Sequence, residues 1–439
     1  MYWLDRLGTK MRNLRVSNSA PWGAVLSRAL TILPDYRWGK GRSRRLVNLT
    51  LETTYRCNLR CSFCFLRDNR LNRRCEELHM GEIEHLADQA RALGCSIYIT
   101  GGEPFLRRDG VEIVEAIKAR GVHAGVNTNG TLLDETRVRR LVSAGLDYVI
   151  VSIHGGAAFH DSVVQRNGTF ERAAETLRQF GRHKGQSHVL VNFVLTQQSA
   201  EQFRAVVDLC AETGADALTV QHRTFLTGRD LEAHARVWPH HFGREEVQLI
   251  CSLHRPNGGE SDRIARGVRQ CRAYAEERKV CCIVKPELAA PMLDTWYSED
   301  YRVDSSCFYP WTDTRVAPDG QVYACQFIPY PVGNIRESGL AELLNNERYR
   351  RFRLALKSAG GQFPGCARCC KLYRGGLRLD GTRRRGAGAG AVASVRVLGR
   401  PKERAPAERV LDGRLRPPHP CGEDREGGGA VQSRSCGQS

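Results

Sequence analysis

The sequence has no long apolar run and no export signal. None of its segments approaches the eighteen or more apolar residues in a row that a membrane-spanning helix requires. The first forty residues do not form the apolar core of a signal peptide, because Asp5, Arg6, Lys10 and Arg12 interrupt it. We therefore expect a cytoplasmic protein without a transmembrane segment.

The chain is also short of acidic residues, with 48 Asp and Glu against 66 Lys and Arg, so its net charge is +18. Basic charge gives weak affinity for polyanions in general. Part of the excess lies after Tyr373, and the rest is spread without runs or interleaved aromatic residues. This distribution does not favour nucleic acid as the main substrate.

Cysteine, by contrast, is abundant, with 17 residues among 439. A reducing cytoplasm disfavours disulfides, so these thiols are interpreted as metal ligands and core side chains. Three of them lie within eight residues, Cys57-Asn-Leu-Arg-Cys61-Ser-Phe-Cys64, directly after a strand-like stretch. Spacings of three and two residues form a tight loop in which thiolates converge on zinc or an iron–sulfur cluster.

Three ligands favour a [4Fe–4S] cluster in which one iron stays open to a group that is not protein. A zinc site would need a fourth ligand nearby, and neither Cys75 nor His79 has the usual spacing. Thiols without any metal are the third alternative.

From residue 46 the sequence alternates between strand and helix patterns, which predicts parallel βαβ units and an α/β fold. Gly94, Gly121, Gly145 and Gly214 stand where helices should end. Six strands fit a partial (β/α)6 TIM-like barrel, in which functional residues gather at the carboxyl ends of the strands. Strands are predicted at 46–53, 96–100, 123–127, 147–152, 189–195 and 217–221, and helices at 81–93, 111–120, 135–144, 170–180 and 201–213.

Unusual residues do follow these strands. The second strand ends in Gly101-Gly102-Glu103, where the glycines permit close backbone approach and Glu103 offers an acceptor for an ammonium group. Asn129 follows the third strand and Ser152 ends the fourth. Arg166, in a later loop, suits a carboxylate. Ordinary turn and capping chemistry is the alternative for Asn129, Ser152 and Arg166.

The spacing C-x3-C-x2-C, with Phe63 before the last cysteine, resembles the signature of the radical S-adenosylmethionine (SAM) superfamily. The resemblance implies that the open iron binds SAM, and that reduction cleaves SAM to methionine and a 5′-deoxyadenosyl radical, which abstracts hydrogen from the substrate. It also implies an electron donor such as flavodoxin or ferredoxin. It identifies no catalytic acid or base.

The strand-end residues acquire roles by the same resemblance. Gly101-Gly102-Glu103 resembles the motif that binds the methionine amine, and Asn129 lies in a segment similar to one near the nucleoside. Ser152 would meet the ribose or the carboxylate, and Arg166 would bind the carboxylate. His154 departs from the family pattern, which often has Asp there. The implied SAM-binding residues are Phe63, Gly101, Gly102, Glu103, Asn129, Ser152 and Arg166.

A second group of cysteines lies towards the end of the chain. Asp319-Gly320 is a hairpin signal that would bring Cys307 and Cys325 together, and Cys366 and Cys369 form a C-x2-C pair. Two such pairs ligate a closed cluster or a structural zinc. The pattern resembles the SPASM/twitch extension of radical SAM enzymes, without the last two cysteines of a full SPASM domain. The resemblance therefore implies one auxiliary [4Fe–4S] cluster on these four thiols, with Cys370 as a spare ligand and with an electron-transfer or structural role.

These patterns predict five segments: an N-terminal extension (1–45), the barrel core (46–225), a connecting region (226–300), the auxiliary cluster domain (301–376) and a disordered basic tail (377–439). A changed reading frame would also explain the abrupt start of the tail. By resemblance, the leading hypothesis is maturation of a ribosomal peptide precursor. The alternatives are radical dehydrogenation or rearrangement of a small molecule, such as a carbohydrate or tetrapyrrole, and a non-catalytic metal protein that binds nucleic acid.

Overall fold

The computed structural model describes residues 32–66, 73–257, 259–288, 290–299, 301 and 306–371. The chain divides into two units, Met1–Arg383 and Arg384–Ser439, and every described residue lies in the first. The predicted tail at 377–439 lies outside the described residues, as does most of the N-terminal extension. No helix in the described part of the chain has both the length and the apolar character needed to cross a membrane.

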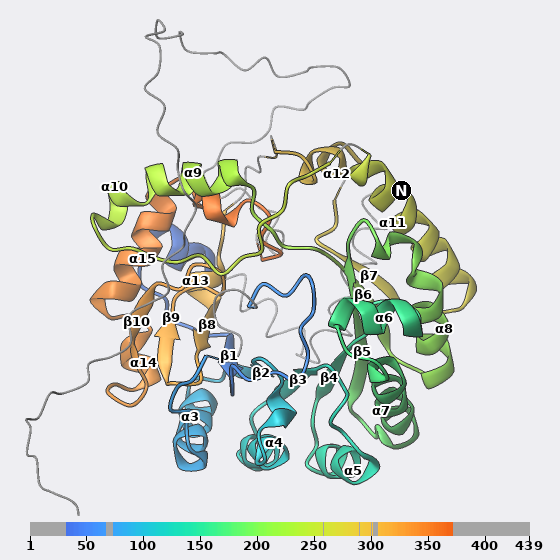
Figure 1. The fold of residues 1–439 in the computed structure, drawn as a ribbon. Coiled ribbons are helices and arrows are strands. Elements are labelled where there is room, and N and C mark those ends of the chain that lie inside the picture. Colours follow the sequence, from blue (N-terminus) through green and yellow to red (C-terminus); the bar gives the residue numbers. More distant parts are fainter. Residues whose placement is uncertain are drawn as a thin grey trace, which may run out of the picture. The chain divides into compact units, whose positions relative to one another are not determined.

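One ten-stranded sheet organises the described residues, in the order β10-β9-β8-β1-β2-β3-β4-β5-β6-β7. The strands from β1 to β6 are the six predicted from the sequence, and each pairs in parallel with the next. Figure 1 shows them as an arc. The bounds are β1 (Asn48–Glu52), β2 (Ser96–Thr100), β3 (Ala124–Thr128), β4 (Tyr148–Ser152), β5 (His188–Leu195) and β6 (Ala217–His222).

Helices connect these strands, and all of them except α6 cover the outer side of the arc in Figure 1. They are amphipathic: α7 (Thr169–His183) buries Ala173, Leu177 and Phe180 at helical spacing. Gly214, the C-cap of α8, has φ 63°, a left-handed value that glycine adopts without a steric penalty. The other connecting helices are α3 (Met80–Ala92), α4 (Gly110–Ala119), α5 (Glu135–Ser143), α6 (Ala157–Val164) and α8 (Phe203–Thr213).

The connecting region contains more regular structure than the sequence indicated. It includes the helix α11 (Glu260–Glu277) and the strand β7 (Cys282–Lys285), which pairs in parallel with β6. The sequence analysis missed β7 because four residues are too few to show a period. The same region holds α9 (Gly228–Val237), α10 (Pro239–Phe242) and α12 (Ala290–Trp296).

The C-terminal cysteine segment continues the barrel sheet. After α13 (Tyr309–Thr312), strand β8 (Asp313–Val316) pairs in parallel with β1, so that Asn48 lies opposite Asp313. The predicted hairpin then joins β8 to β9 (Gln321–Tyr323), and Gly320 in its turn has φ 79°. The rest of the segment comprises β10 (Pro331–Asn334), α14 (Leu340–Leu343) and α15 (Glu347–Ser358).

Candidate active site

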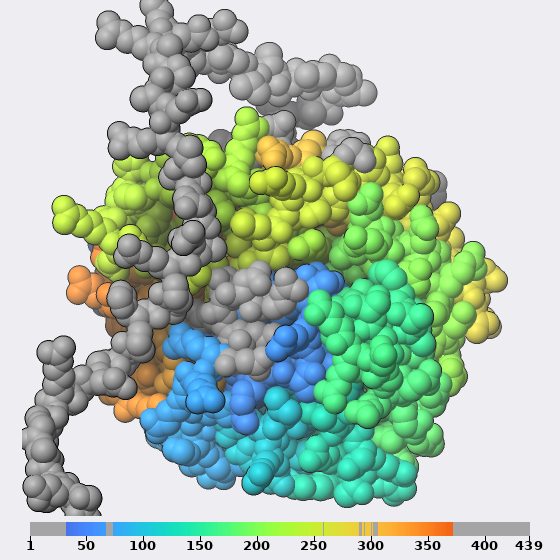
Figure 2. All heavy atoms as spheres, in the orientation of Figure 1, coloured from blue at the N-terminus to red at the C-terminus, as the bar shows by residue number. Residues whose placement is uncertain are grey.

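The loop with the first three cysteines leaves the carboxyl end of β1, on the inner side of the arc (Figure 1). Two of its backbone amides hydrogen-bond the end of α6: Arg60 N–H donates to Val164 O (3.1 Å) and Ser62 N–H to Val163 O (2.9 Å). The Cys64 amide closes a turn on Cys61 O (3.1 Å). In Figure 2, blue residues from this part of the chain lie in the middle of the face shown, bordered by green ones.

The glycines after β2 hold the start of that loop. Gly102 N–H donates to Thr54 O (2.7 Å), and Glu103 N–H donates to Arg56 O (2.8 Å). A Cβ atom on Gly101 or Gly102 would collide with the carbonyl oxygen of Thr54 or Arg56. Among the described residues, the close approach that these glycines permit is therefore to the backbone that leads to Cys57.

The Glu103 carboxylate is buried, with 1% of the residue exposed. It accepts hydrogen bonds from the Thr128 hydroxyl (2.7 Å), the Asn129 amide (2.7 Å) and the Phe105 amide (3.2 Å). Burial nevertheless raises the pKa of Glu103 from 4.5 to about 7, which means that the three donors only partly replace water around the charge. A bound cation would complete that stabilisation.

The thiols of the loop act electrostatically on one another and on Glu103. Burial raises the pKa of Cys57 to about 11, and the charges of Glu103 and Cys64 add to the effect. Burial likewise raises the pKa of Cys61 to about 12, with further contributions from Cys64 and Cys57. Iron binds the thiolate form, so an iron–sulfur cluster held by these thiols would offset the effect of burial.

Within the described part of the chain, no three Cys, His, Asp or Glu side chains converge closely enough to hold one metal ion. A single zinc ion draws its thiolates to about 2.3 Å, whereas the ligands of a cluster bind different irons and stand farther apart.

Asn58, between the first two cysteines, links the loop to the third strand. Its side-chain oxygen accepts from Asn129 Nδ2 (2.9 Å), and its Nδ2 donates to the Thr131 hydroxyl (2.9 Å). Arg166 is fixed to the same residue, because its Nη1 donates to Asn58 O (3.2 Å). Asn58 was not among the predicted site residues, although its place between two predicted ligands was a usable signal.

Phe63, within the cysteine loop, contacts His154, which follows β4. Their rings pack edge to face with centroids 4.7 Å apart, and the His154 ring also stacks on His160 at 5.7 Å. Burial lowers the pKa of His154 to about 3, so the imidazole is neutral. The residue that departs from the family pattern thus forms the packing surface for Phe63. Ser152 ends β4 half-buried, in register with Asn192 of β5.

The structure brings the other four predicted cysteines together. Cys307, Cys325, Cys366 and Cys369 are all buried, and a turn closes the last pair through the Cys369 amide and Cys366 O (3.0 Å). Burial raises the pKa of Cys307 to about 12 and that of Cys366 well above its ordinary value, and the charge of Cys325 adds to both shifts. A hydrogen bond with Cys370 is the main cause of the raised pKa of Cys369. The donor set therefore suits a second cluster.

Two buried arginines connect this group to the barrel. Arg315 on β8 pairs with Glu52 at the end of β1 (2.7 Å) and donates to Gln326 O (2.9 Å), next to Cys325. Arg368, between Cys366 and Cys369, pairs with Asp230 of α9 (2.5 Å). The partners of each pair lie more than one hundred residues apart, so no local sequence pattern indicates them.

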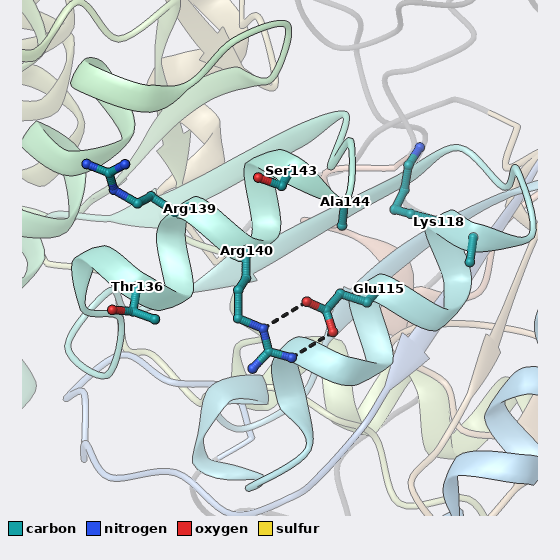
Figure 3. Close-up of a pocket in the computed structure, with 8 residues that line it drawn as sticks. Glu115, Lys118, Thr136, Arg139, Arg140, Ser143 and Ala144 are labelled. Atoms are coloured by element: carbon teal, nitrogen blue, oxygen red, sulfur yellow. Dashed lines mark hydrogen bonds and ion pairs between the residues drawn. The ribbon is translucent and has the colours of Figure 1, made fainter.

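Figure 3 shows an open cavity of about 580 Å³ that lies elsewhere, between α4 and α5. Arg140 and Glu115 form an ion pair across it (2.7 Å). Both helices cover the outer side of the sheet, and none of the predicted site residues lines this cavity. It is therefore not part of the candidate active site.

Comparison with known proteins agrees with this geometry. Residues 51–210 match the model of the radical SAM superfamily, and residues 307–370 match SPASM, an iron–sulfur cluster-binding domain. Fe-coproporphyrin III synthase of Methanosarcina barkeri is 29% identical over 176 residues, which are 39% of this chain and 43% of that protein. The chain therefore matches less than half the length of this curated relative.

Solved structures share the fold. Streptococcus suis SuiB, bound to its precursor peptide SuiA, has a TM-score of 0.54 and 18% identity, with 76% of this chain and 73% of SuiB covered. The anSMEcpe structure with bound AdoMet has a TM-score of 0.50 and 18% identity, with 70% and 84% covered. At such identities the similarity shows the fold alone.

A partial (β/α) barrel with a three-cysteine loop at its strand ends, followed by a cysteine-rich hairpin segment, defines an α/β protein with two candidate iron–sulfur sites. The chain belongs to the radical SAM superfamily and carries a SPASM-type domain. This confirms the fold class, the enzyme class, and S-adenosylmethionine and iron–sulfur clusters as the cofactors predicted from the sequence.

Proposed function

We propose that the chain cleaves SAM reductively at a [4Fe–4S] cluster held by Cys57, Cys61 and Cys64. When bound there, the two cofactors supply a 5′-deoxyadenosyl radical that abstracts a hydrogen atom from the substrate. The observation that carries this proposal is the buried Glu103 carboxylate. It acts electrostatically on the Cys57 thiol, and no cationic side chain in the described part of the chain forms an ion pair with it. An ammonium group bound at Glu103 would sit beside the cluster site.

The other site residues have positioning roles in this proposal. Gly101 and Gly102 hold the start of the cysteine loop against the end of β2. Asn129 orients both Glu103, through its amide, and the loop, through Asn58. Phe63 supports the loop on His154. Ser152 and Arg166 remain proposed contacts for the nucleoside and carboxylate parts of SAM.

We further propose that Cys307, Cys325, Cys366 and Cys369 hold one auxiliary [4Fe–4S] cluster. Four thiolates leave no iron open, so this cluster would transfer electrons or support the structure rather than bind substrate. The Glu52–Arg315 pair fixes its position relative to β1. Reduced flavodoxin or ferredoxin would supply the electron for SAM cleavage, which agrees with the predicted cytoplasmic location.

For the substrate, a peptide is our leading proposal, and the fold shared with a protein solved in complex with a precursor peptide supports it. A tetrapyrrole with carboxylate side chains is the second candidate. It is favoured by the curated relative, whose name describes a coproporphyrin product.

Anaerobic reconstitution tests the proposed function. The reconstituted protein is reduced with dithionite and given SAM, and bound iron and 5′-deoxyadenosine are measured. We expect about eight irons per chain, as two [4Fe–4S] clusters require, together with deoxyadenosine formation that Cys61→Ala abolishes. Cys75→Ala, outside both cysteine groups, is the matched control and should retain both. Iron without deoxyadenosine would contradict the proposal.

A further inference from the structure

Arg223 directly follows β6, at the same carboxyl edge of the barrel as the cysteine loop and Glu103. Its backbone amide donates to Leu195 O (3.3 Å), so the pairing with β5 extends to this residue. Successive strand residues point to opposite faces, which places Arg223 on the face of Ala217. Ala217 packs with Leu190 and Ile283 in a small cluster that contains no helical residue, and this face therefore looks into the barrel.

The charge of Arg223 is not matched by a direct partner. Among the described residues, no carboxylate forms an ion pair with it, and its buried Nε has no hydrogen-bond partner. Glu260 acts on it only from a distance, and the Glu260 carboxylate already pairs with His254 (2.8 Å). Burial lowers the pKa of Arg223, which shows that the surroundings do not compensate the charge.

The contrast with the two arginines of the auxiliary segment is informative. Arg315 and Arg368 are more deeply buried, and each forms an ion pair with a buried carboxylate. A buried guanidinium without such a partner is costly to the fold unless a ligand supplies the anion. Arg223 is only half-buried, so a ligand can reach it.

Arg223 is also close in the chain to residues that contact the second cysteine group. Two residues further on, Phe225 contacts the guanidinium of Arg368 (4.6 Å to the ring centroid), which belongs to the turn between Cys366 and Cys369. Thr224, between them, has a buried hydroxyl without a partner in the described part of the chain.

We propose that Arg223 binds a carboxylate group of the substrate at the opening of the barrel. Arginine suits this task because its planar fork of donors matches the two carboxylate oxygens. This proposal rests on the proposed function, because the bound carboxylate belongs to a substrate only if the protein is the proposed enzyme. Both candidate substrates offer the chemistry, as the acidic side chains or terminus of a peptide and as the propionates of a tetrapyrrole.

The test measures binding to the reconstituted protein with SAM and without reductant. The probes are a porphyrin with free propionates and its methyl ester, and a Glu-containing peptide and its esterified form. We expect at least one free acid to bind about ten- to a hundredfold more tightly than its ester, as a charge-assisted hydrogen bond provides. The pair that shows this preference distinguishes the tetrapyrrole from the peptide.

Variants test whether Arg223 causes the preference for the free acid over its ester. Arg223→Gln should remove it, and Arg223→Lys, which keeps the charge but not the fork, should reduce it. Arg236→Gln, an exposed arginine of α9, is the matched control and should retain it. Three results would overturn the proposal. The unchanged protein could bind acid and ester equally, or bind neither acid at millimolar concentration. The preference for the acid could also persist in folded Arg223→Gln. Absence of SAM cleavage would refute the proposed function instead, because this binding assay needs no turnover.

Discussion

Replacing Glu103 by Gln should have opposite effects on stability and on cofactor binding. Gln has nearly the same shape, can accept from the Asn129 amide and can donate to Thr128, but it carries no charge and no longer accepts from the Phe105 amide. The pKa of Glu103 rises from 4.5 to about 7 on folding, so protonation of this carboxyl group stabilises the folded state relative to the unfolded state. The free energy of unfolding of the unchanged protein therefore falls as pH rises from about 4.5 to about 7.

The size of the effect follows from the shift. A difference of 4.5 to about 7 corresponds to about 3 kcal/mol above pH 7, since each pH unit is worth about 1.4 kcal/mol. Without SAM, Glu103→Gln should thus be more stable than the unchanged protein by about 3 kcal/mol at pH 8 and about equally stable near pH 4.5. Its affinity for SAM should fall about ten- to a hundredfold, because an amide does not neutralise an ammonium group.

Urea unfolding at both pH values and equilibrium binding of SAM to the reconstituted protein measure the two effects. Glu232→Gln, an exposed carboxylate of α9, is the control and should change neither. Reduced stability of Glu103→Gln at pH 8, together with unchanged SAM affinity, would refute the reasoning that Glu103 is a buried charge awaiting a cation.

Two further predictions concern the C-terminal segment. Arg315→Met removes one partner of a buried ion pair and should lower the free energy of unfolding by about 3–5 kcal/mol; in urea unfolding, the double variant with Glu52→Gln should recover part of that loss, and equal loss in both would show that the pair is not coupled. The double variant Cys369→Ser/Cys370→Ser, which also removes the predicted spare ligand, should reduce bound iron from about eight to about four per chain while SAM cleavage continues; a protein that keeps all its iron would exclude both residues as ligands.

Local sequence patterns were sufficient for the barrel but not for its connections. The six strands and the hairpin at Gly320 follow from period and turn chemistry, which act over a few residues. The pairing of β8 with β1 joins Asn48 to Asp313 across most of the chain, and no local pattern encodes it. The short strand β7 was missed for lack of length.

The candidate site shows the same division. The cysteine spacings and Glu103 could be identified from the sequence, because each lies in a short motif. The structure was needed to show that Gly101 and Gly102 approach the cysteine loop itself, and that Phe63 rests on His154. These are contacts between different strand ends, and only folding of the barrel brings them together.

The parallel pairing of β8 with β1 has a consequence for dissecting the protein. Residues 306–371 are not an appendage that can be cut away, because their removal would leave β1 as an unpaired edge beside the cysteine loop. Exposed edge strands invite intermolecular pairing and aggregation. A shortened barrel would therefore lose solubility before it revealed what the first cluster does alone, and single-residue variants are the better way to separate the two centres.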